Sequence, residues 1–236
     1  MMILNEEWMY VHIPKTSGVN FKTVVSKTYK KPFKIFAEIQ DSIQVPKINE
    51  LYWGNYNQEI NNALGITADF RSCFADLVKT SPLFMWEEAE VYTDQKVFTI
   101  VRNPYTRLVS QYEDNLKSLK SVYTLDEIPS LEDYLFNPKF VKLSGNQGYS
   151  IAKRNQVEYL QNRNGEIVCD RFYKMETHQK KLQRDFRLEN IELIKYNSNE
   201  YNKNYSEIYT DKLINFVQTN FKKDFEYFEY DINPFW

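Results

Sequence analysis

Two segments of this chain have the pattern of a buried strand that passes through a tight turn directly into a helix. The first starts with an apolar, β-prone run at residues 8–13, which Pro14 ends. The second starts with an apolar run at residues 96–101, after which Asn103 can cap a helix and Pro104 takes its first position. Residues at helical spacing follow both turns: Phe21, Val24, Val25 and Thr28 in the first, and Tyr105, Leu108, Val109, Tyr112, Leu116 and Leu119 in the second. Strands that alternate with helices predict an α/β fold with a mainly parallel sheet.

The remaining elements are expected from shorter patterns. Residues 167–169 are a plausible third strand, and Ser130 begins a capping signal for a short helix. Further helices are expected at residues 58–64, 70–79, 176–186 and 210–221. We find no internal repeat, coiled-coil heptad or Gly/Ser linker in the 236 residues, so we expect one domain that spans residues 1–236.

Charge and composition narrow the possible partners and the location. The chain has 30 Lys and Arg residues against 32 Asp and Glu residues. That balance argues against a general nucleic-acid binder, so an anionic ligand must be held by a few placed cations. The two cysteines, Cys73 and Cys169, fit a reducing compartment. Because we see neither a secretory signal nor an apolar stretch long enough to span a bilayer, we expect a cytoplasmic protein without a transmembrane segment, with a trimmed lumenal domain as the alternative.

The turn after the first strand, at residues 13–18 (IPKTSG), has the chemistry of an anion site. A helix N-terminus exposes backbone N–H groups and a positive dipole end. Gly18 allows close approach of the backbone, and the Thr16 and Ser17 hydroxyls can donate hydrogen bonds. Lys15 adds a full positive charge. The pattern is not a Walker A loop. It predicts a phosphate site, with an ordinary strand-to-helix turn and a solvated lysine as the alternative.

Arg102 and Ser110 form a second candidate phosphate site. Arg102 follows the second strand, at the carboxyl end where open α/β sheets bind their ligands. Ser110 lies eight residues later, about two helical turns along, and off the apolar face. An arginine and a hydroxyl placed in this way can clamp a phosphate. Taken singly, Arg102 could be an ion-pair partner and Ser110 a solvent-facing serine.

Together the two motifs resemble those of the sulfotransferases that use 3′-phosphoadenosine 5′-phosphosulfate (PAPS). Residues 10–18 (YVHIPKTSG) and 101–112 (VRNPYTRLVSQY) are similar to the branch with the heparan- and chondroitin-type carbohydrate enzymes. Weaker echoes lie at residues 155–160 (NQVEYL), 171–176 (RFYKME) and 224–230 (DFEYFEY). The resemblance implies a P-loop-like three-layer α/β fold, with a central, mainly parallel sheet flanked by helices, in a single sulfotransferase domain.

The resemblance also implies roles for individual residues. Lys15 approaches the oxygen that bridges phosphate and sulfate, and Arg102 and Ser110 clamp the 3′-phosphate. Arg154, next to Lys153, is a further contact to that phosphate or to an anionic acceptor, with a solvated basic pair as the alternative. The residues that surround the 5′-phosphate are Thr16, Ser17, Gly18, Val19 and Asn20. The family commonly reads T-G-G-T-[ST] here, and the hydroxyl lost at Val19 should weaken binding by about tenfold at most.

The general base is the least determined residue of the site. Residues 65–70 (GITADF) resemble the G-x-H-A-D stretch of heparan 6-O-sulfotransferases, in which the histidine is the base. Thr67 stands at that position and cannot act as a base near neutral pH. Asp69 is the nearest carboxylate and Glu59 is another candidate. His12 lies beside the phosphate turn, but a histidine that ends a buried strand is more often structural.

The implied reaction moves a sulfuryl group from PAPS to a hydroxyl of an acceptor, with a glycan as the expected acceptor and PAP as the product. No metal ion is required by that chemistry, and the sequence has no cluster with metal-ligand spacing. A nucleotide or small-molecule kinase is an alternative, against which the lack of a Walker A loop and of a carboxylate pair for Mg²⁺ argues. A PAP-binding module that has lost its base is a second alternative, motivated by Thr67.

Overall fold

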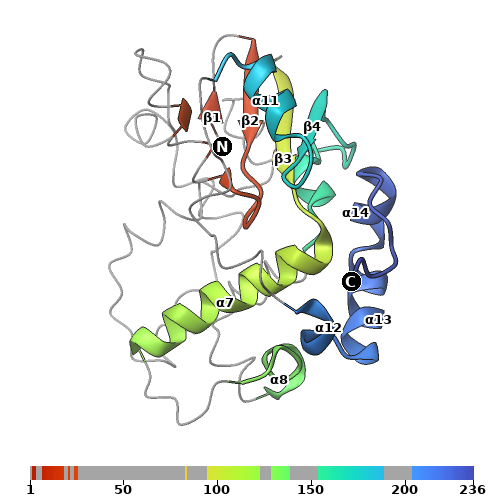
Figure 1. The fold of residues 1–236 in the computed structure, drawn as a ribbon. Coiled ribbons are helices and arrows are strands. Elements are labelled where there is room, and N and C mark those ends of the chain that lie inside the picture. Colours follow the sequence, from red (N-terminus) through yellow and green to blue (C-terminus); the bar gives the residue numbers. More distant parts are fainter. Residues whose placement is uncertain are drawn as a thin grey trace. The chain divides into compact units, whose positions relative to one another are not determined.

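The computed structural model describes residues 2–3, 7–18, 21, 24–25, 83, 95–122, 129–138, 154–188 and 204–236 (Figure 1). The chain divides into two compact units, each made of several segments. Unit 1 contains Met1–Ile13, Val25–Thr99 and Glu158–Phe172. Unit 2 contains Pro14–Val24, Ile100–Val157 and Tyr173–Trp236. The single domain over residues 1–236 stays a prediction.

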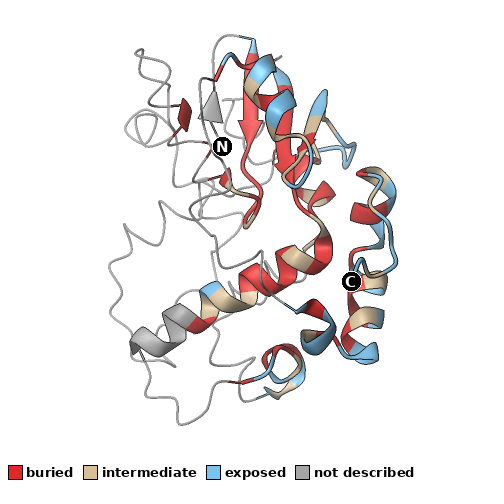
Figure 2. Cartoon of the chain, in the orientation of Figure 1, coloured by how far each residue is buried: buried red, intermediate tan, exposed pale blue. Residues whose placement is uncertain are grey.

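A four-stranded sheet in the order β1-β2-β3-β4 confirms the expected α/β class. Its strands are β1 (Met2–Ile3), β2 (Trp8–Val11), β3 (Lys96–Val101) and β4 (Arg171–Lys174). β1 pairs antiparallel with β2, and β2 pairs parallel with β3, with Tyr10 opposite Phe98. β2 is buried at every position and β3 at all but its first (Figure 2). Continuous apolar runs of this kind are typical of parallel strands covered on both faces.

Aromatic side chains fill the part of unit 1 around β2 and β3. The Phe98 ring lies 5.3 Å from that of Tyr10 and 5.9 Å from that of Trp8, measured between centroids. The Arg171 guanidinium lies 5.0 Å and the Lys96 ammonium 5.5 Å from the centre of the Trp8 ring. Cation–π contacts of this kind cover the indole with the long side chains of two basic residues.

The third strand does not lie at residues 167–169, where the sequence predicts it. Ile167 forms only an isolated bridge with Gln161 and is 38% exposed. Contact with β3 begins at Asp170, whose N–H donates to the Val97 carbonyl at 2.8 Å and whose Oδ2 accepts from the Val97 N–H at 2.7 Å. The polar residue Asp170 forms the first hydrogen bonds to β3, and the strand starts directly after it, at Arg171. The apolar residues 167–169 lie outside the ladder.

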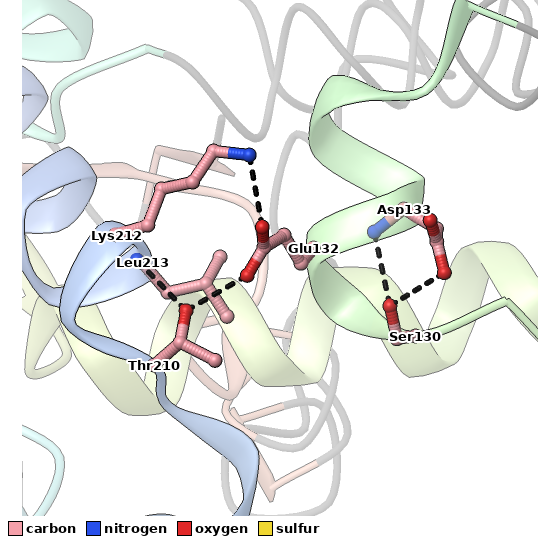
Figure 3. Close-up of polar contacts among 6 residues, drawn as sticks. All are labelled: Ser130, Glu132, Asp133, Thr210, Lys212 and Leu213. Atoms are coloured by element: carbon pink, nitrogen blue, oxygen red, sulfur yellow. Dashed lines mark hydrogen bonds and ion pairs between the residues drawn. The ribbon is translucent and has the colours of Figure 1, made fainter.

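The helix after β3 confirms the predicted capping chemistry. α7 (Pro104–Val122) begins with Pro104 at its first position, and the Asn103 Oδ1 accepts from the Tyr105 N–H at 2.9 Å. Figure 3 shows two further caps in unit 2. Ser130 accepts from the Asp133 N–H at the start of α8 (Leu131–Phe136), and Thr210 from the Leu213 N–H at the start of α13 (Asp211–Asn220). Both helices match their predicted positions.

The helix expected at residues 176–186 is shorter, since α11 covers Gln179–Asp185. Glu176, the first residue of the predicted helix, lies before α11. Its carboxylate accepts hydrogen bonds from the Asn103 N–H and the Tyr230 hydroxyl, at 2.7 and 2.9 Å. The remaining described elements are η1 (Val157–Leu160), α12 (Tyr205–Ile208) and α14 (Lys222–Tyr227). The helices expected at residues 58–64 and 70–79 lie outside the described residues.

The core of unit 2 is built from the apolar faces of five helices. α7 contributes three of the side chains predicted to face inward, and α8, α12, α13 and α14 pack against them. The cluster consists of Tyr105, Leu108, Val109, Leu131, Tyr134, Leu135, Tyr205, Tyr209, Leu213, Phe216, Val217, Phe221 and Phe225. Each such side chain stabilises the fold by about 1.5–3 kcal/mol through the apolar surface it removes from water. This packing fixes α7, which carries Ser110 of the candidate site.

Candidate functional site

The loop after β2 has a strained backbone at two residues that are not glycine. Lys15 and Ser17 both have φ of 67°, and between them Thr16 is completely buried. Helical backbone starts at Gly18, and the Phe21 N–H donates to the Ser17 carbonyl at 3.0 Å. A left-handed conformation costs a non-glycine residue about 1–2 kcal/mol, and such strain is concentrated at functional sites. Left-handed residues in a tight turn also form the backbone nests that bind anions.

Arg102 holds this loop from the end of β3. The side chain is only 3% exposed, and its Nη1 donates to the Lys15 carbonyl oxygen at 3.1 Å, across 87 residues of sequence. Its Nε donates to the Thr106 hydroxyl at 3.0 Å on the first turn of α7. The two motifs that the sequence singled out therefore meet in unit 2.

The main chain of Arg102 is fixed by the side chain of Gln156. The Arg102 N–H donates to the Gln156 Oε1 at 2.9 Å, and the Gln156 Nε2 donates to the Arg102 carbonyl at 2.8 Å. Gln156 is fully buried. Its Nε2 also donates to the Asp224 Oδ2 at 3.2 Å, while the Val157 N–H donates to the Asp224 Oδ1 at 3.0 Å. Gln156 and Asp224 lie in two of the segments with weaker resemblance, residues 155–160 and 224–230. Both segments thus help to fix the main chain of Arg102.

Asp224 is a carboxylate in a completely buried position. Burial raises its pKa above the usual value of 3.8, while the charge of Arg107 and the hydrogen bonds from Gln156 and Val157 act in the opposite direction. Its ionised form therefore depends on the residues around it. Asp224 has no exposed surface that a substrate could contact. It therefore positions Gln156 and the Val157 main chain rather than binding a substrate.

Arg107, on α7, is a further member of the site to which the sequence motifs assign no role. Its side chain is buried, with 4% exposed. Its Nε donates to the Pro14 carbonyl at 3.3 Å, and its Nη1 donates to the Arg154 carbonyl at 2.9 Å. The only signal that could have shown it is its spacing on α7, three residues before Ser110 and seven before Asp114, which puts all three on one helical face.

The same face of α7 contacts Lys15, the lysine of the turn at residues 13–18. The Lys15 Nζ lies 3.0 Å from the Asp114 Oδ2, and the two side chains are 20% and 57% exposed. Ser110, one turn earlier, is 6% exposed and so is not the solvent-facing serine of the alternative interpretation. Lys15, Ser110 and Arg102 are thus carried by the loop, by α7 and by the end of β3 within one unit.

The other predicted site residues are placed in different ways. Arg154 is partly exposed, and its contact with Arg107 goes through its backbone carbonyl. His12, in unit 1, is 7% exposed and its ring stacks on Tyr10 with centroids 6.1 Å apart, which fits a structural histidine. Val19, Asn20 and Asp69 lie outside the described residues, as do Glu59 and Thr67.

The described ranges contain no group of three or more His, Cys, Asp or Glu residues placed to hold a metal ion. Within the same ranges, no helix combines the length and the apolar character needed to cross a membrane.

Comparison with known proteins gives one match. The family model described as "Sulfotransferase family" matches residues 4–231, which is nearly the whole chain. The comparisons with curated proteins and with solved structures gave no match. The matched region contains the turn at residues 13–18, Arg102, α7 and the residues that support them.

Proposed function

This chain belongs to the sulfotransferase family, and from that premise we propose that it transfers a sulfuryl group from PAPS to a hydroxyl of an acceptor and releases PAP. Its family makes it a transferase of sulfuryl groups. The donor, the acceptor and the roles of single residues are the proposed part.

The observation that carries the proposal is the hydrogen bond from the Arg102 Nη1 to the Lys15 carbonyl, 3.1 Å long. It joins the turn that can hold one phosphate to the arginine that can hold another. A donor with phosphates at both its 3′ and 5′ positions suits two such sites next to each other. The buried and strained loop, and the buried arginine, fit an anionic group better than they fit a solvated turn.

We assign the 5′-phosphosulfate to the loop and the 3′-phosphate to Arg102 and Ser110. Thr16, Ser17 and Gly18 offer N–H groups and hydroxyls to the first, and the predicted contacts of Val19 and Asn20 complete that set. Arg154 remains a proposed additional contact to the 3′-phosphate. Guanidinium groups form charge-assisted hydrogen bonds to phosphate, which are about twice as strong as neutral ones.

The proposed chemistry is an in-line displacement. The acceptor oxygen attacks sulfur while the bond from sulfur to the bridging oxygen breaks, and negative charge grows on the departing phosphate. Lys15 stabilises that charge, and the loop holds the reacting groups in position. Because the leaving group is a stable phosphate, the reaction as proposed does not require a metal ion.

A carbohydrate is the proposed acceptor, on the resemblance of both motifs to carbohydrate sulfotransferases. A cytoplasmic location likewise stays a prediction from the sequence. Acceptor loops vary on a shared scaffold, so the acceptor has to be found by experiment.

Calorimetry with PAP and with AMP, which lacks the 3′-phosphate, tests the donor assignment. We expect PAP to bind more tightly than AMP without magnesium, and Arg102→Lys to weaken PAP binding far more than AMP binding. A preference for Mg-ATP over PAP would contradict the proposal and favour a kinase.

Transfer of radiolabelled sulfate from PAPS to a panel of glycans and phenols tests the reaction itself. We expect Lys15→Ala to lower the rate by about 10²–10³, as for the loss of one donor to a developing oxyanion. Tight PAP binding without transfer to any acceptor would instead indicate a binding module.

A further inference from the structure

We propose that Asp114 is the general base of this enzyme, the group that takes the proton from the acceptor hydroxyl. The inference rests on the proposed function, since it uses Lys15 as the mark of the reacting centre. The starting observation is the 3.0 Å distance between the Asp114 Oδ2 and the Lys15 Nζ. No motif in the sequence points to Asp114, which lies one turn after Ser110 on α7.

Exposure separates Asp114 from the other acidic groups described near the loop in unit 2. The Asp114 side chain is 57% exposed, so an acceptor can reach it, while Lys15 beside it is 20% exposed. Asp224 is completely buried and accepts from the Val157 N–H. Glu176 accepts from the Asn103 N–H and the Tyr230 hydroxyl, so its carboxylate fixes the main chain after β3. Asp114 combines contact with the lysine and access from solvent.

Asp114 is also better suited to act as a general base than Thr67 or His12. Thr67 cannot act as a base, and the His12 ring is packed against Tyr10 and 7% exposed. A carboxylate is a suitable base for a hydroxyl whose proton leaves as the bond to sulfur forms. Asp69 stays a candidate from the sequence and is the main competitor in the experiment below.

Lys15 and Asp114 exchange partners during the proposed reaction. In the donor-free enzyme the Lys15 ammonium pairs with Asp114. When the donor binds, the ammonium turns to the bridging oxygen and the Asp114 carboxylate accepts a hydrogen bond from the acceptor hydroxyl. The acceptor oxygen then bonds to sulfur, its proton moves to Asp114, and the electron pair of the broken sulfur–oxygen bond stays on the phosphate. PAP leaves, and Asp114 returns its proton to water.

The ion pair predicts opposite effects on binding and on turnover. In the wild type, Lys15 has to leave the Asp114 carboxylate before it can contact the donor. Without the Asp114 charge this ion pair does not compete with donor binding. Because the pair is partly exposed, the gain in PAP affinity should be small, up to about fivefold. Loss of the base should lower turnover by at least about 10²-fold.

The experiment measures PAP affinity by calorimetry and sulfate transfer from radiolabelled PAPS to the best acceptor found for the wild-type enzyme. For Asp114→Asn we expect unchanged or tighter PAP binding and the large loss of turnover. Asp114→Glu, and Asp114→Ala with added formate, should recover at least about tenfold of that loss, because each restores a carboxylate. Glu113→Gln, which removes the same charge from the neighbouring position of α7, should keep turnover within about twofold of wild type.

Three results would overturn the inference. Turnover of Asp114→Asn within about threefold of wild type would make Asp114 only the counterion of Lys15 and favour Asp69. A large loss of PAP affinity in that variant would place Asp114 in donor binding. A wild-type enzyme that neither binds PAP nor transfers sulfate would refute the proposed function itself, and this inference with it.

Discussion

The side-chain amide of Gln156 pairs with both main-chain polar groups of Arg102, at 2.9 and 2.8 Å, in the way that a neighbouring strand would. Arg102 follows the last residue of β3, so the amide continues the pattern of the sheet by one residue. The backbone from which the arginine side chain starts is therefore fixed. A side chain 54 residues away thus decides where the guanidinium can point.

Replacement of Gln156 should weaken both the fold and the site. Gln156→Ala leaves the buried N–H and carbonyl of Arg102 without these partners, which predicts a loss of about 2–4 kcal/mol in the free energy of unfolding. Urea denaturation measures it, and calorimetry should show weaker PAP binding. Gln161→Ala is the control, because the bond from Gln161 Nε2 to the Gly165 carbonyl is 3.4 Å long and exposed. Equal losses in the two variants would contradict the structural role of Gln156.

Arg107 should matter more for stability than any arginine on the surface. Arg107→Met removes the donors to the Pro14 and Arg154 carbonyls and the positive charge that opposes the raised pKa of Asp224. We expect a loss of about 2–4 kcal/mol in the free energy of unfolding. Arg184→Met, whose side chain is 77% exposed in the wild type, should change it by less than about 0.5 kcal/mol.

The Arg107→Met loss should also depend on pH. A carboxyl whose folded pKa is raised contributes stability that is complete below its usual pKa of 3.8 and is lost as the pH rises through the folded pKa. Without Arg107 the pKa of Asp224 rises further, so the difference in stability between wild type and variant should grow as the pH rises from about 4 towards 7. A difference that stays constant over this range would show that the two side chains are not coupled.

The strain at Ser17 predicts a substitution that stabilises the protein. Ser17 has φ of 67°, which glycine adopts without steric cost. After the greater freedom of glycine in the unfolded chain is subtracted, Ser17→Gly should raise the free energy of unfolding by about 0.5–1 kcal/mol. Thermal denaturation checks this. Ser206→Gly, within α12, should instead lower it by up to about 1 kcal/mol.

The contact between α8 and α13 should lose stability in acid (Figure 3). Hydrogen bonds from Lys212 and Thr210 hold the pKa of Glu132 below its usual 4.5. A carboxyl with a lowered pKa stabilises the folded state above its usual pKa and loses that effect as the pH falls through the lowered value. Glu132→Gln should therefore melt below wild type at pH 7, and the difference should shrink as the pH falls below 4.5. In a Lys212→Met background the same substitution should show a smaller difference at pH 7.

Local patterns in the sequence predicted β2, β3, α7, α8 and α13, and α11 with a longer range, but they did not predict β1, η1, α12 or α14. The apolar runs before Pro14 and Arg102 became β2 and β3, and Asn103, Ser130 and Thr210 cap the helices that follow them. Where the sequence prediction failed, contacts between residues distant in the sequence decided the outcome. Residues 167–169 have strand-forming side chains but no partner strand beyond one bridge, and the start of α11 moved because Glu176 bonds to Asn103 and Tyr230.

The sequence by itself determined the α/β class, and it singled out the turn at residues 13–18 and Arg102 as candidate phosphate contacts, because strand period, helix period and turn chemistry act between residues a few positions apart. Only the tertiary structure decided that Arg107 is buried and donates to the Pro14 carbonyl. It also decided that Gln156, held by Asp224, fixes the main chain of Arg102, and that Asp114 contacts Lys15. These contacts join residues 54 to 99 positions apart, and their existence depends on how the helices pack rather than on any spacing along the chain.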